Sequence, residues 1–311
     1  MRTLFAMGAH GDLVREIQQN LTQVGFSPGK LDGDYGPATA GAVRQFQSAN
    51  GQLQTGSIDE HTWTPLMNRP VPSVSERSLQ LTSAFEGHGF GLAVGNFDGA
   101  LLTWGIIGFT LASGEIQQIV LSISRQFPNV VRQAFGDNTA ELLQLMQADR
   151  AFQTQWANAH TVDGRALAEP WKSMFAVFGA APEVQAEQLK RAHDKYMQPA
   201  VHTAGKLGFT SELGLALCFD IHVQNGGIKS TTMAEIAPQL PGLQEADARA
   251  LVANAVADSA RLQYREDVRS RKLTIATGSG SVHGHPYVLA DWGLDGAFAA
   301  DELARQSAPA V

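Results

Sequence analysis

The sequence of 311 residues has one cysteine, no long apolar run and no excess of basic charge. Cys218 lies alone in the apolar run LGLALCFD, so it forms no disulfide within the chain, and we expect a buried, inert thiol. No stretch approaches the ~18–20 apolar residues that a membrane span needs, so we expect no membrane insertion. The net charge is −7, which argues against a nucleic-acid partner because phosphate binding needs a basic face.

The first residues also lack a secretory signal. The stretch MRTLFAMGAHGD carries one arginine and about five apolar residues before polar sequence resumes, which is too short for the apolar core of a signal peptide. We therefore expect a protein that is made in the cytoplasm without a signal peptide.

The composition is that of an ordinary globular protein, with 44% hydrophobic and 17% charged residues, and the length allows two domains. Apolar residues recur mostly at helical spacing, and strand-like stretches are few, at residues 101–110 and 287–289. The pattern predicts a mainly α protein with a minor β element. In the longer part of the chain, the expected helices span residues 79–86, 114–126, 129–134, 138–156, 164–178, 182–205, 210–225, 231–237 and 244–273.

Residues 1–68 are predicted to form a separate domain. A helix with Asp12 as its N-cap is followed by a turn at residues 31–37, a second amphipathic helix and a short third helix near Trp63. Residues 69–76 contain two prolines and two serines, so they are predicted to be a linker. Residues 77–311 then form the second domain.

The motifs of the first domain follow one another in a specific order: a helix, then DGDYGPAT, then AVRQFQ, then TWTPL. This order resembles the three-helix peptidoglycan-binding module of bacterial wall hydrolases. The resemblance implies that the DG turn and the groove between the helices contact the peptide or glycan of the wall. We assign this contact to Asp32, Gly33, Tyr35 and Gln47.

The stretch from residue 81 to residue 120 carries the side chains best suited to catalysis. Glu86 ends an apolar-faced helix, and Asp98 lies in the glycine-rich turn GNFDG. Glycosidic hydrolysis needs one carboxyl that stays protonated for the leaving group and one that stays ionised to activate water. Burial beside Phe85 would raise the pKa of Glu86, and a solvated loop would leave the pKa of Asp98 low. From the spacing alone, two solvated surface carboxylates are the alternative.

The surrounding residues resemble the motif of the glycoside hydrolase family 46 chitosanases. The matching positions, in the family's order and spacing, are Asp98-Gly99, Thr103, Gly105-Ile106-Ile107-Gly108-Phe109 and Glu115. One departure is that Leu101 and Leu102 replace the usual glycine and aromatic residue, which leaves the catalytic roles intact but bears on the substrate contacts.

The resemblance implies a two-lobed, lysozyme-like helical fold and an inverting mechanism. Glu86 would be the general acid, Asp98 the general base, and Thr103 would help to hold the attacking water. Glu115 would bind sugar. Inversion implies carboxyl groups about 6.5–9.5 Å apart, which leaves room for the water.

The resemblance extends, more loosely, into the C-terminal half. LGLALCFDIHVQNGG is similar to a family helix whose aspartate would be Asp220, part of an Asp–Arg network that steadies the general acid. The arginine of that network would be Arg261 or, less directly, Arg249. His283 is assigned to a sugar contact or to structure, because the HGH pair has no further ligands at metal-site spacing. The substrate-binding candidates are Glu115, Asp220, Arg261 and His283, and no metal or organic cofactor is implied.

Three functions stay open at this point. We favour inverting cleavage of the β-1,4 backbone of peptidoglycan, because tethering to an insoluble polymer helps when the polymer is the substrate. The alternatives are hydrolysis of chitosan, whose positive charge suits an acidic protein, and a catalytically inactive wall-binding protein. We expect a monomer that acts at the bacterial cell wall or in the periplasm, delivered by phage lysis or by a contact-dependent secretion machine.

Overall fold

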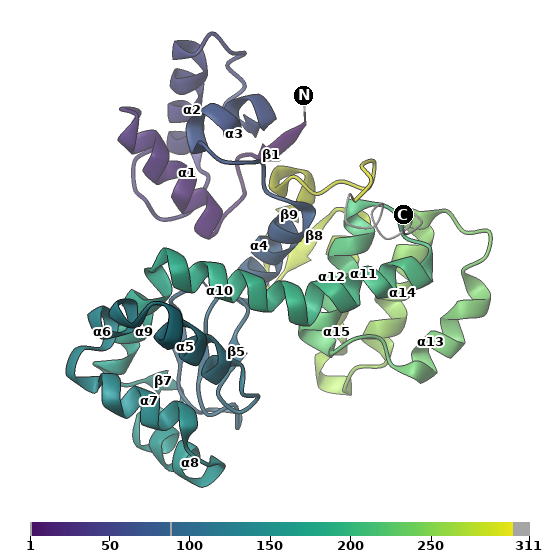
Figure 1. The fold of residues 1–311 in the computed structure, drawn as a ribbon. Helices are drawn as coiled ribbons and strands as arrows, with labels where there is room; N and C mark the ends of the chain where they lie inside the picture. Colours follow the sequence, from purple (N-terminus) through teal and green to yellow (C-terminus); the bar gives the residue numbers. More distant parts are fainter. Residues whose placement is uncertain (1, 88, 301–311) are drawn as a thin grey trace, which may run out of the picture. The chain divides into compact units, whose positions relative to one another are not determined.

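The computed structural model describes residues 2–87 and 89–300, which are mainly helical, as predicted (Figure 1). The chain forms two compact units. The first takes in the described parts of Met1–Phe85 and Lys195–Val311, and the second is Glu86–Asp194.

The N-terminal module occupies the start of the first unit. Its three helices lie where the apolar spacing predicts them, and its two short strands pair antiparallel, with Phe5 opposite Ile58. Ile17, Val43 and Trp63 are fully buried, so the helices share one small core. The elements of the module are β1 (Thr3–Phe5), α1 (Asp12–Gln23), α2 (Pro37–Ala49), β2 (Ile58–Asp59) and α3 (Glu60–Met67) (Figure 1).

The residues expected to form a linker are held in place. The Arg69 guanidinium pairs with Glu16 at 2.7 Å and lies over the Trp63 ring at 4.8 Å from its centre. The indole Nε1 of Trp63 donates to the carbonyl oxygens of Arg69 and Pro70 at 3.1 and 2.9 Å. The next helix, α4 (Val74–Glu86), begins at once. The segment expected to be a linker, residues 69–76, therefore makes side-chain contacts with the module, and its last three residues already belong to α4.

The module also contacts the C-terminal part of the first unit directly. Arg2 and Arg77 both pair with Glu212, whose side chain is 1% exposed, at 2.5 and 2.7 Å. The backbone N–H of Ala6 donates to the carbonyl oxygen of Asp291 at 3.0 Å. Because these contacts bury a charged group and join backbone to backbone, we expect the module and the rest of this unit to stabilise each other.

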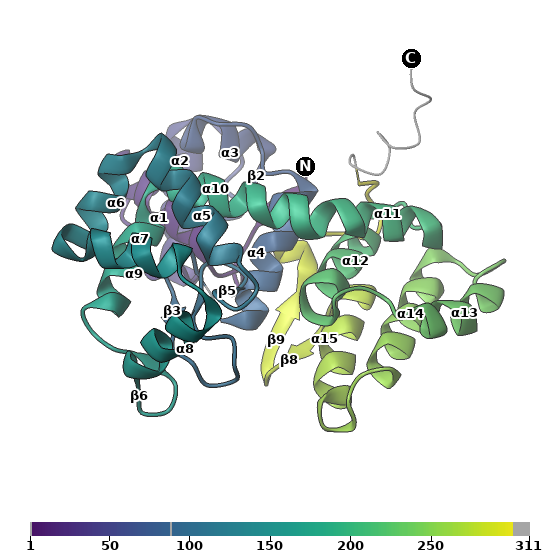
Figure 2. The same cartoon turned by 60° about the horizontal axis from the view of Figure 1, so that its bottom comes forward.

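The remaining elements of the first unit are helices with one β-hairpin. All ten residues from Glu212 to Ile221 are buried, so α12 is the central helix of this unit. The hairpin lies beside α15 in both views (Figure 2). These elements are α11 (Gln198–Leu207), α12 (Glu212–Asn225), α13 (Ser230–Ile236), α14 (Glu245–Asp258), α15 (Arg265–Thr277), β8 (Ser279–Val282) and β9 (His285–Val288).

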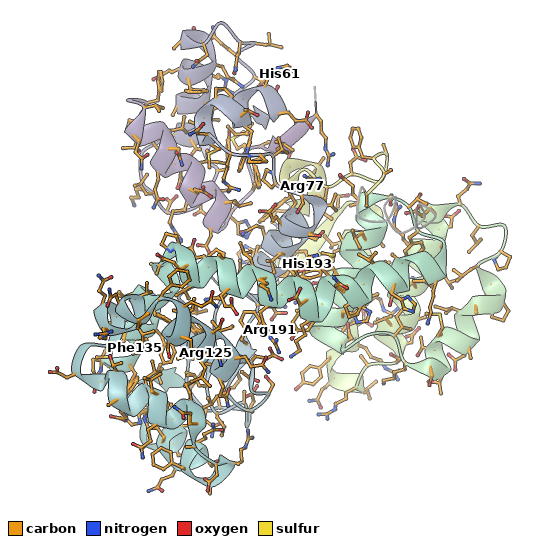
Figure 3. All side chains as sticks on the ribbon, viewed as in Figure 1. His61, Arg77, Arg125, Phe135, Arg191 and His193 are labelled. Carbon is orange, nitrogen blue, oxygen red and sulfur yellow. The ribbon has the colours of Figure 1, made fainter. Side chains whose placement is uncertain are left out.

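The second unit combines a small antiparallel sheet with helices. Its strand order is β5-β4-β3-β7-β6, and an aromatic cluster that includes Phe135 fills the helical side (Figure 3). The strands are β3 (Ala93–Val94), β4 (Thr103–Trp104), β5 (Phe109–Thr110), β6 (Thr161–Val162) and β7 (Ala166–Leu167). The helices are α5 (Glu115–Gln126), α6 (Pro128–Phe135), α7 (Thr139–Gln147), α8 (Arg150–Ala159), α9 (Trp171–Ala180) and α10 (Pro182–Ala192).

Three of the predicted helices are wrong in extent. The segment 138–156 is two helices, because the Asp149 side chain accepts from the Phe152 N–H at 2.9 Å and caps a new helix. The segment 164–178 starts as a strand, and its helix begins only after Pro170. The segment 244–273 breaks between Asp258 and Arg265, where a short 3₁₀ turn intervenes.

Candidate functional site

Glu86 is the last residue of α4 and is half-buried. The preceding Phe85 is buried and packs edge-on against the Tyr287 ring, with ring centres 4.8 Å apart. The helix ends because Gly87 has a φ of 65°, a left-handed conformation that glycine adopts without strain. The sequence prediction that Glu86 closes a helix before a glycine turn is confirmed.

Asp98 lies in the loop between β3 and β4 and is exposed. Its Oδ1 accepts from the backbone N–H of Ala100 at 3.0 Å, which orients the carboxylate within its own turn. Asn96 fixes the loop from the other side: it donates to Asn158 at 2.8 Å and accepts from the Leu101 N–H at 3.1 Å. An exposed carboxylate therefore sits on a loop whose backbone is held on both flanks.

Leu101 takes the place of the family's glycine and has a φ of 68°. A left-handed conformation is costly for a residue with a Cβ, by about 1–2 kcal/mol. The side chain is only 3% exposed, and the neighbouring Leu102 is fully buried. The loop therefore keeps the backbone shape that glycine favours while both leucines point into the core.

Thr103 begins β4 and pairs with Val94 on one side and Thr110 on the other. It is half-buried, and within the described residues nothing hydrogen-bonds to its hydroxyl. The short strand places this hydroxyl five residues after Asp98, at the end of the held loop. Such an arrangement suits a hydroxyl that holds a water.

Glu115 begins α5 but is not an open carboxylate, because it is 5% exposed and accepts from the Arg191 guanidinium. That hydrogen bond raises the pKa of Arg191, which extends from α10 (Figure 3). We expected Glu115 to pair with a sugar ammonium. In the structure, the Arg191 guanidinium of the same unit pairs with this carboxylate, and the sugar contact stays a prediction.

Gln188 ties together the loops on either side of the site. It is fully buried on α10, donates to the carbonyl oxygen of Phe90 at 3.0 Å and accepts from the Ile106 N–H at 3.0 Å. A Cβ at Gly105 would lie 2.5 Å from the Gln188 Oε1, so this turn needs glycine both for space and for its φ of 89°. The GIIGF motif thus owes its first glycine to a buried glutamine that sequence reasoning missed.

Asp220 is fully buried in the first unit and pairs with two cations. Arg271 donates to it at 2.6 Å and Lys272 lies within pairing distance, at 2.5 Å; both cations are buried as well. Burial alone would raise the pKa of Asp220, but the two cations outweigh it and hold the pKa well below its ordinary value. Thr82 of α4 donates to the same carboxylate at 3.0 Å, one helical turn before Glu86. The network therefore supports the helix that carries the expected acid.

The arginine of this network is Arg271, and the prediction of Arg261 is wrong. Arg261 is exposed in the break between α14 and α15, a break that the expected continuous helix did not contain. Arg249 donates instead to Ser211 at 2.9 Å and to Glu245 at 3.1 Å. Because it is fully buried, Asp220 is a support rather than a direct contact to substrate.

His283 sits in the turn of the β8–β9 hairpin with a φ of 51° and pairs with Asp267 at 2.8 Å. Its side chain is half-exposed, so this contact gives it a local structural role. Among the described residues, no group of three or more His, Cys, Asp or Glu side chains is arranged to hold a metal ion. In the same described ranges, no helix is both long and apolar enough to cross a membrane.

The residues assigned to wall binding divide into two kinds. Asp32 is exposed, and a hydrogen bond from the Asp34 N–H, with a second from Gln18, lowers its pKa. Gly33 is needed for space, since a Cβ there would lie 2.8 Å from the Gly11 carbonyl oxygen. Only Asp32 of the four assigned residues is exposed.

Tyr35 and Gln47 are internal, so their assignment as wall contacts is corrected. The Tyr35 hydroxyl donates to the Gly56 carbonyl oxygen at 2.9 Å, and burial raises its pKa. The Gln47 amide donates to Ser57 at 2.9 Å and accepts from the Gly56 N–H at 2.9 Å. Their hydrogen-bonding capacity is used inside the module.

The sequence did carry a signal for the missed cations. Arg271 and Lys272 lie between Val268 and Ile275, on the buried stripe of α15. Charged residues at the spacing of an apolar stripe need a buried partner, and Asp220 is the acidic residue of an otherwise apolar buried helix. For Gln188 and Arg191 the sequence carried no comparable signal.

Two family models match the chain. Residues 10–66 match a model described as Putative peptidoglycan binding domain, and residues 83–255 match one described as Glycosyl hydrolase family 46. Both matches agree with the resemblances drawn from the motifs.

Three solved structures are similar in fold. The GH46 chitosanase of Gynuella sunshinyii in complex with chitotetraose is 20% identical over 67% of this chain and 87% of that one, with a TM-score of 0.46. Native chitosanase from Bacillus subtilis is 20% identical over 66% and 86%, with a TM-score of 0.46. A mutant of that chitosanase complexed with 6 GlcN is 18% identical over 70% and 98%, with a TM-score of 0.49.

Proposed function

Because the chain belongs to glycosyl hydrolase family 46, we propose that it is an inverting endo-hydrolase of β-1,4-linked glucosamine polymers, a chitosanase-type enzyme. Glu86 is the general acid in this proposal. Asp98 is the general base, and Thr103 holds the attacking water. Two parts of this proposal need their own experiments: the identity of the substrate and the stereochemistry of the cleavage.

The observation that carries the proposal is the placement of Asp98. Its carboxylate is exposed, yet the loop around it is held by Asn96 and by its own turn. A general base needs access to solvent for its water and a fixed position relative to the sugar. Thr103 follows on β4 with a free hydroxyl among the described residues, which supports a shared water.

Charge favours the glucosamine polymer as substrate. The second unit holds eleven acidic and seven basic residues, a net charge of −4. A polycationic chain is attracted to such a unit, and the attraction weakens as salt is added. This net charge predicts an overall preference for a cationic polymer. It does not describe the charges next to the Asp98 loop.

Peptidoglycan is the second candidate substrate, because residues 10–66 match the peptidoglycan-binding module. The module suggests action at the cell wall. Peptidoglycan has the same β-1,4 backbone geometry but carries acyl groups and lactyl-peptides in place of ammonium groups.

The deciding assay sets the purified chain against chitosan and against peptidoglycan sacculi, with product masses as the readout. Glu86→Gln and Asp98→Asn are the matched controls, and each is expected to lose about 10²–10⁴-fold of the rate. Cleavage of sacculi but not of chitosan would move the assignment to the wall glycan. Equal rates for wild type and Glu86→Gln on the cleaved glycan would overturn the acid, and absence of cleavage of either polymer would leave the inactive wall-binding alternative.

Stereochemistry tests the water-mediated role of Asp98. Attack by water gives the α-anomer from a β-linked glycan, whereas direct attack by the carboxylate gives the β-anomer through a covalent intermediate. We expect the α-anomer. NMR of the new reducing end, recorded before mutarotation, distinguishes the two, and a β-anomer would make Asp98 a nucleophile or the wrong residue.

A further inference from the structure

Phe97, directly before Asp98, is an aromatic side chain that the proposed mechanism does not use. Its side chain remains 47% exposed. The Arg165 guanidinium lies over the ring, 4.8 Å from its centre. The guanidinium covers one face of the ring, so ring surface remains available beside the carboxylate of the expected base.

The ring and the guanidinium are held by neighbouring backbone. The preceding Asn96 receives a hydrogen bond on its side chain from the Leu101 N–H, and its own N–H donates to the Thr161 hydroxyl at 2.7 Å. The Arg165 carbonyl oxygen accepts from the Gly95 N–H at 2.8 Å. Strand β7, which follows Arg165, pairs with β3, which leads into the loop. The sheet and these hydrogen bonds therefore fix the backbone next to both side chains.

Two guanidinium groups lie at this ring and its loop, next to the Asp98 carboxylate, although the unit as a whole is acidic. Within the described residues, no carboxylate pairs with Arg165. Arg150 donates to the carbonyl oxygen of Gly99 at 3.3 Å, so a second guanidinium contacts the same loop. A sugar stacked on Phe97 would thus lie close to positive charge.

We propose that Phe97 and Arg165 form a sugar subsite that prefers a unit without an ammonium group, namely an N-acylated sugar. The apolar C–H face of a pyranose packs on an aromatic ring as other apolar surfaces do, while the polar substituents stay at the rim. Arg165 repels the ammonium of a glucosamine unit and accommodates the carbonyl oxygen of an acylamino group as a hydrogen-bond donor. This inference rests on the proposed glycosidase function. It adds that one bound sugar carries an acylamino group rather than an ammonium group.

The subsite also gives the loop an aromatic contact that its motif lacks. Leu102 stands where the family has an aromatic residue, and it is fully buried. Phe97 lies five residues earlier and is exposed. The loop therefore presents an aromatic ring at residue 97, whereas residue 102 is a buried leucine.

The test measures kcat and KM on glucosamine oligomers and on chitosans of graded N-acetylation, using the full chain. Phe97→Ala is expected to raise KM about tenfold on acetylated substrates, the effect of uncovering one ring face, with kcat nearly unchanged. Phe97→Tyr, which keeps an aromatic ring, should keep KM on acetylated substrates near the wild-type value. Phe127→Ala, at a similarly exposed phenylalanine between α5 and α6, is the matched control and should change nothing.

Arg165 is tested by charge. Arg165→Glu is expected to shift the ratio of kcat/KM for acetylated over free oligomers toward the free form by about threefold to tenfold, whereas Arg165→Lys should hold the ratio near wild type. Mass spectrometry of the products shows whether acetylated units gather at one new end. An unchanged ratio in Arg165→Glu, or an unchanged KM in Phe97→Ala, would overturn the subsite.

A binding measurement separates this inference from the proposed function. Titration of Glu86→Gln with N-acetylglucosamine oligomers, with glucosamine oligomers and with soluble muropeptide glycan reports the subsite without turnover. Tighter binding of both acylated ligands that is lost in Glu86→Gln/Phe97→Ala supports the subsite even if wild type cleaves no chitosan. If only one of the two acylated ligands binds more tightly, that ligand identifies the polymer that supplies the acylated sugar. Tighter binding of free glucosamine oligomers contradicts the proposal.

Discussion

Replacing Asp220 by asparagine should destabilise the protein strongly, because it removes the carboxylate that pairs with two buried cations. Arg271 is 1% exposed and Lys272 is fully buried, and both pair with the single Asp220 carboxylate. Removing one partner from a buried ion pair costs about 3–5 kcal/mol. For units of 150–250 residues, this corresponds to a fall in Tm of roughly 6–20 °C.

The same substitution should change how stability depends on pH. The Asp220 carboxyl has a pKa well below its ordinary value in the folded protein, because Arg271 and Lys272 outweigh the effect of burial. Its contribution is therefore complete above the unfolded-state pKa of about 3.9 and is lost as the pH falls toward the folded-state pKa. Asp220→Asn should accordingly flatten the loss of stability below about pH 4.

The assay is denaturant unfolding of wild type and Asp220→Asn across the acid range, with Asp258→Asn as control. Asp258 pairs with Arg269 at 2.7 Å on the surface, with a side chain 62% exposed, so its loss should cost less than about 1 kcal/mol. Lys272→Met added to Asp220→Asn should recover part of the stability, since it removes one of the two buried cations whose carboxylate partner was replaced. Equal effects of the Asp220 and Asp258 substitutions, with no recovery by Lys272→Met, would refute the argument.

Three further predictions follow from the described contacts. Thr103→Ala should reduce kcat less than Asp98→Asn, because a hydroxyl only positions the water; the reverse order in steady-state kinetics would exchange their roles. Gln188→Leu should lower the unfolding free energy by about 2–4 kcal/mol in denaturant titration, since two buried hydrogen bonds are lost; a loss below 1 kcal/mol would contradict this. Deleting residues 1–70 should lower the Tm or prevent folding, because Glu212 loses Arg2 and buried surface is uncovered; an unchanged Tm would show that the module is separable.

Much of the local structure could be predicted from the sequence, because its signals are local. The helix end at Glu86 follows from the glycines behind it, and the turn around Asp98 follows from the GNFDG pattern. The motif order also identified both families. These inferences depend on neighbouring residues along the chain, where backbone preference and spacing decide the outcome.

The features that could not be predicted depend on contacts between residues that lie far apart in the sequence. Arg271 is 51 residues from Asp220, and Arg191 is 76 residues from Glu115. The assumed continuous helix over 244–273 assigned the wrong arginine, since the break at residues 259–264 resets which residues face α12. The contacts of residues 69–76 could not be predicted for a related reason: composition does not reveal that Trp63 and Glu16 hold Arg69.

The substitution of glycine by Leu101 explains how the loop can be both unusual in sequence and suited to its task. The left-handed backbone costs about 1–2 kcal/mol. Burial of the leucine side chain, 3% exposed, returns about 1.5–3 kcal/mol. Because the two effects are of similar size, the conformation is maintained by packing rather than by a flexible glycine. A loop stiffened in this way holds Asp98 in place and positions the backbone of Phe97 beside it.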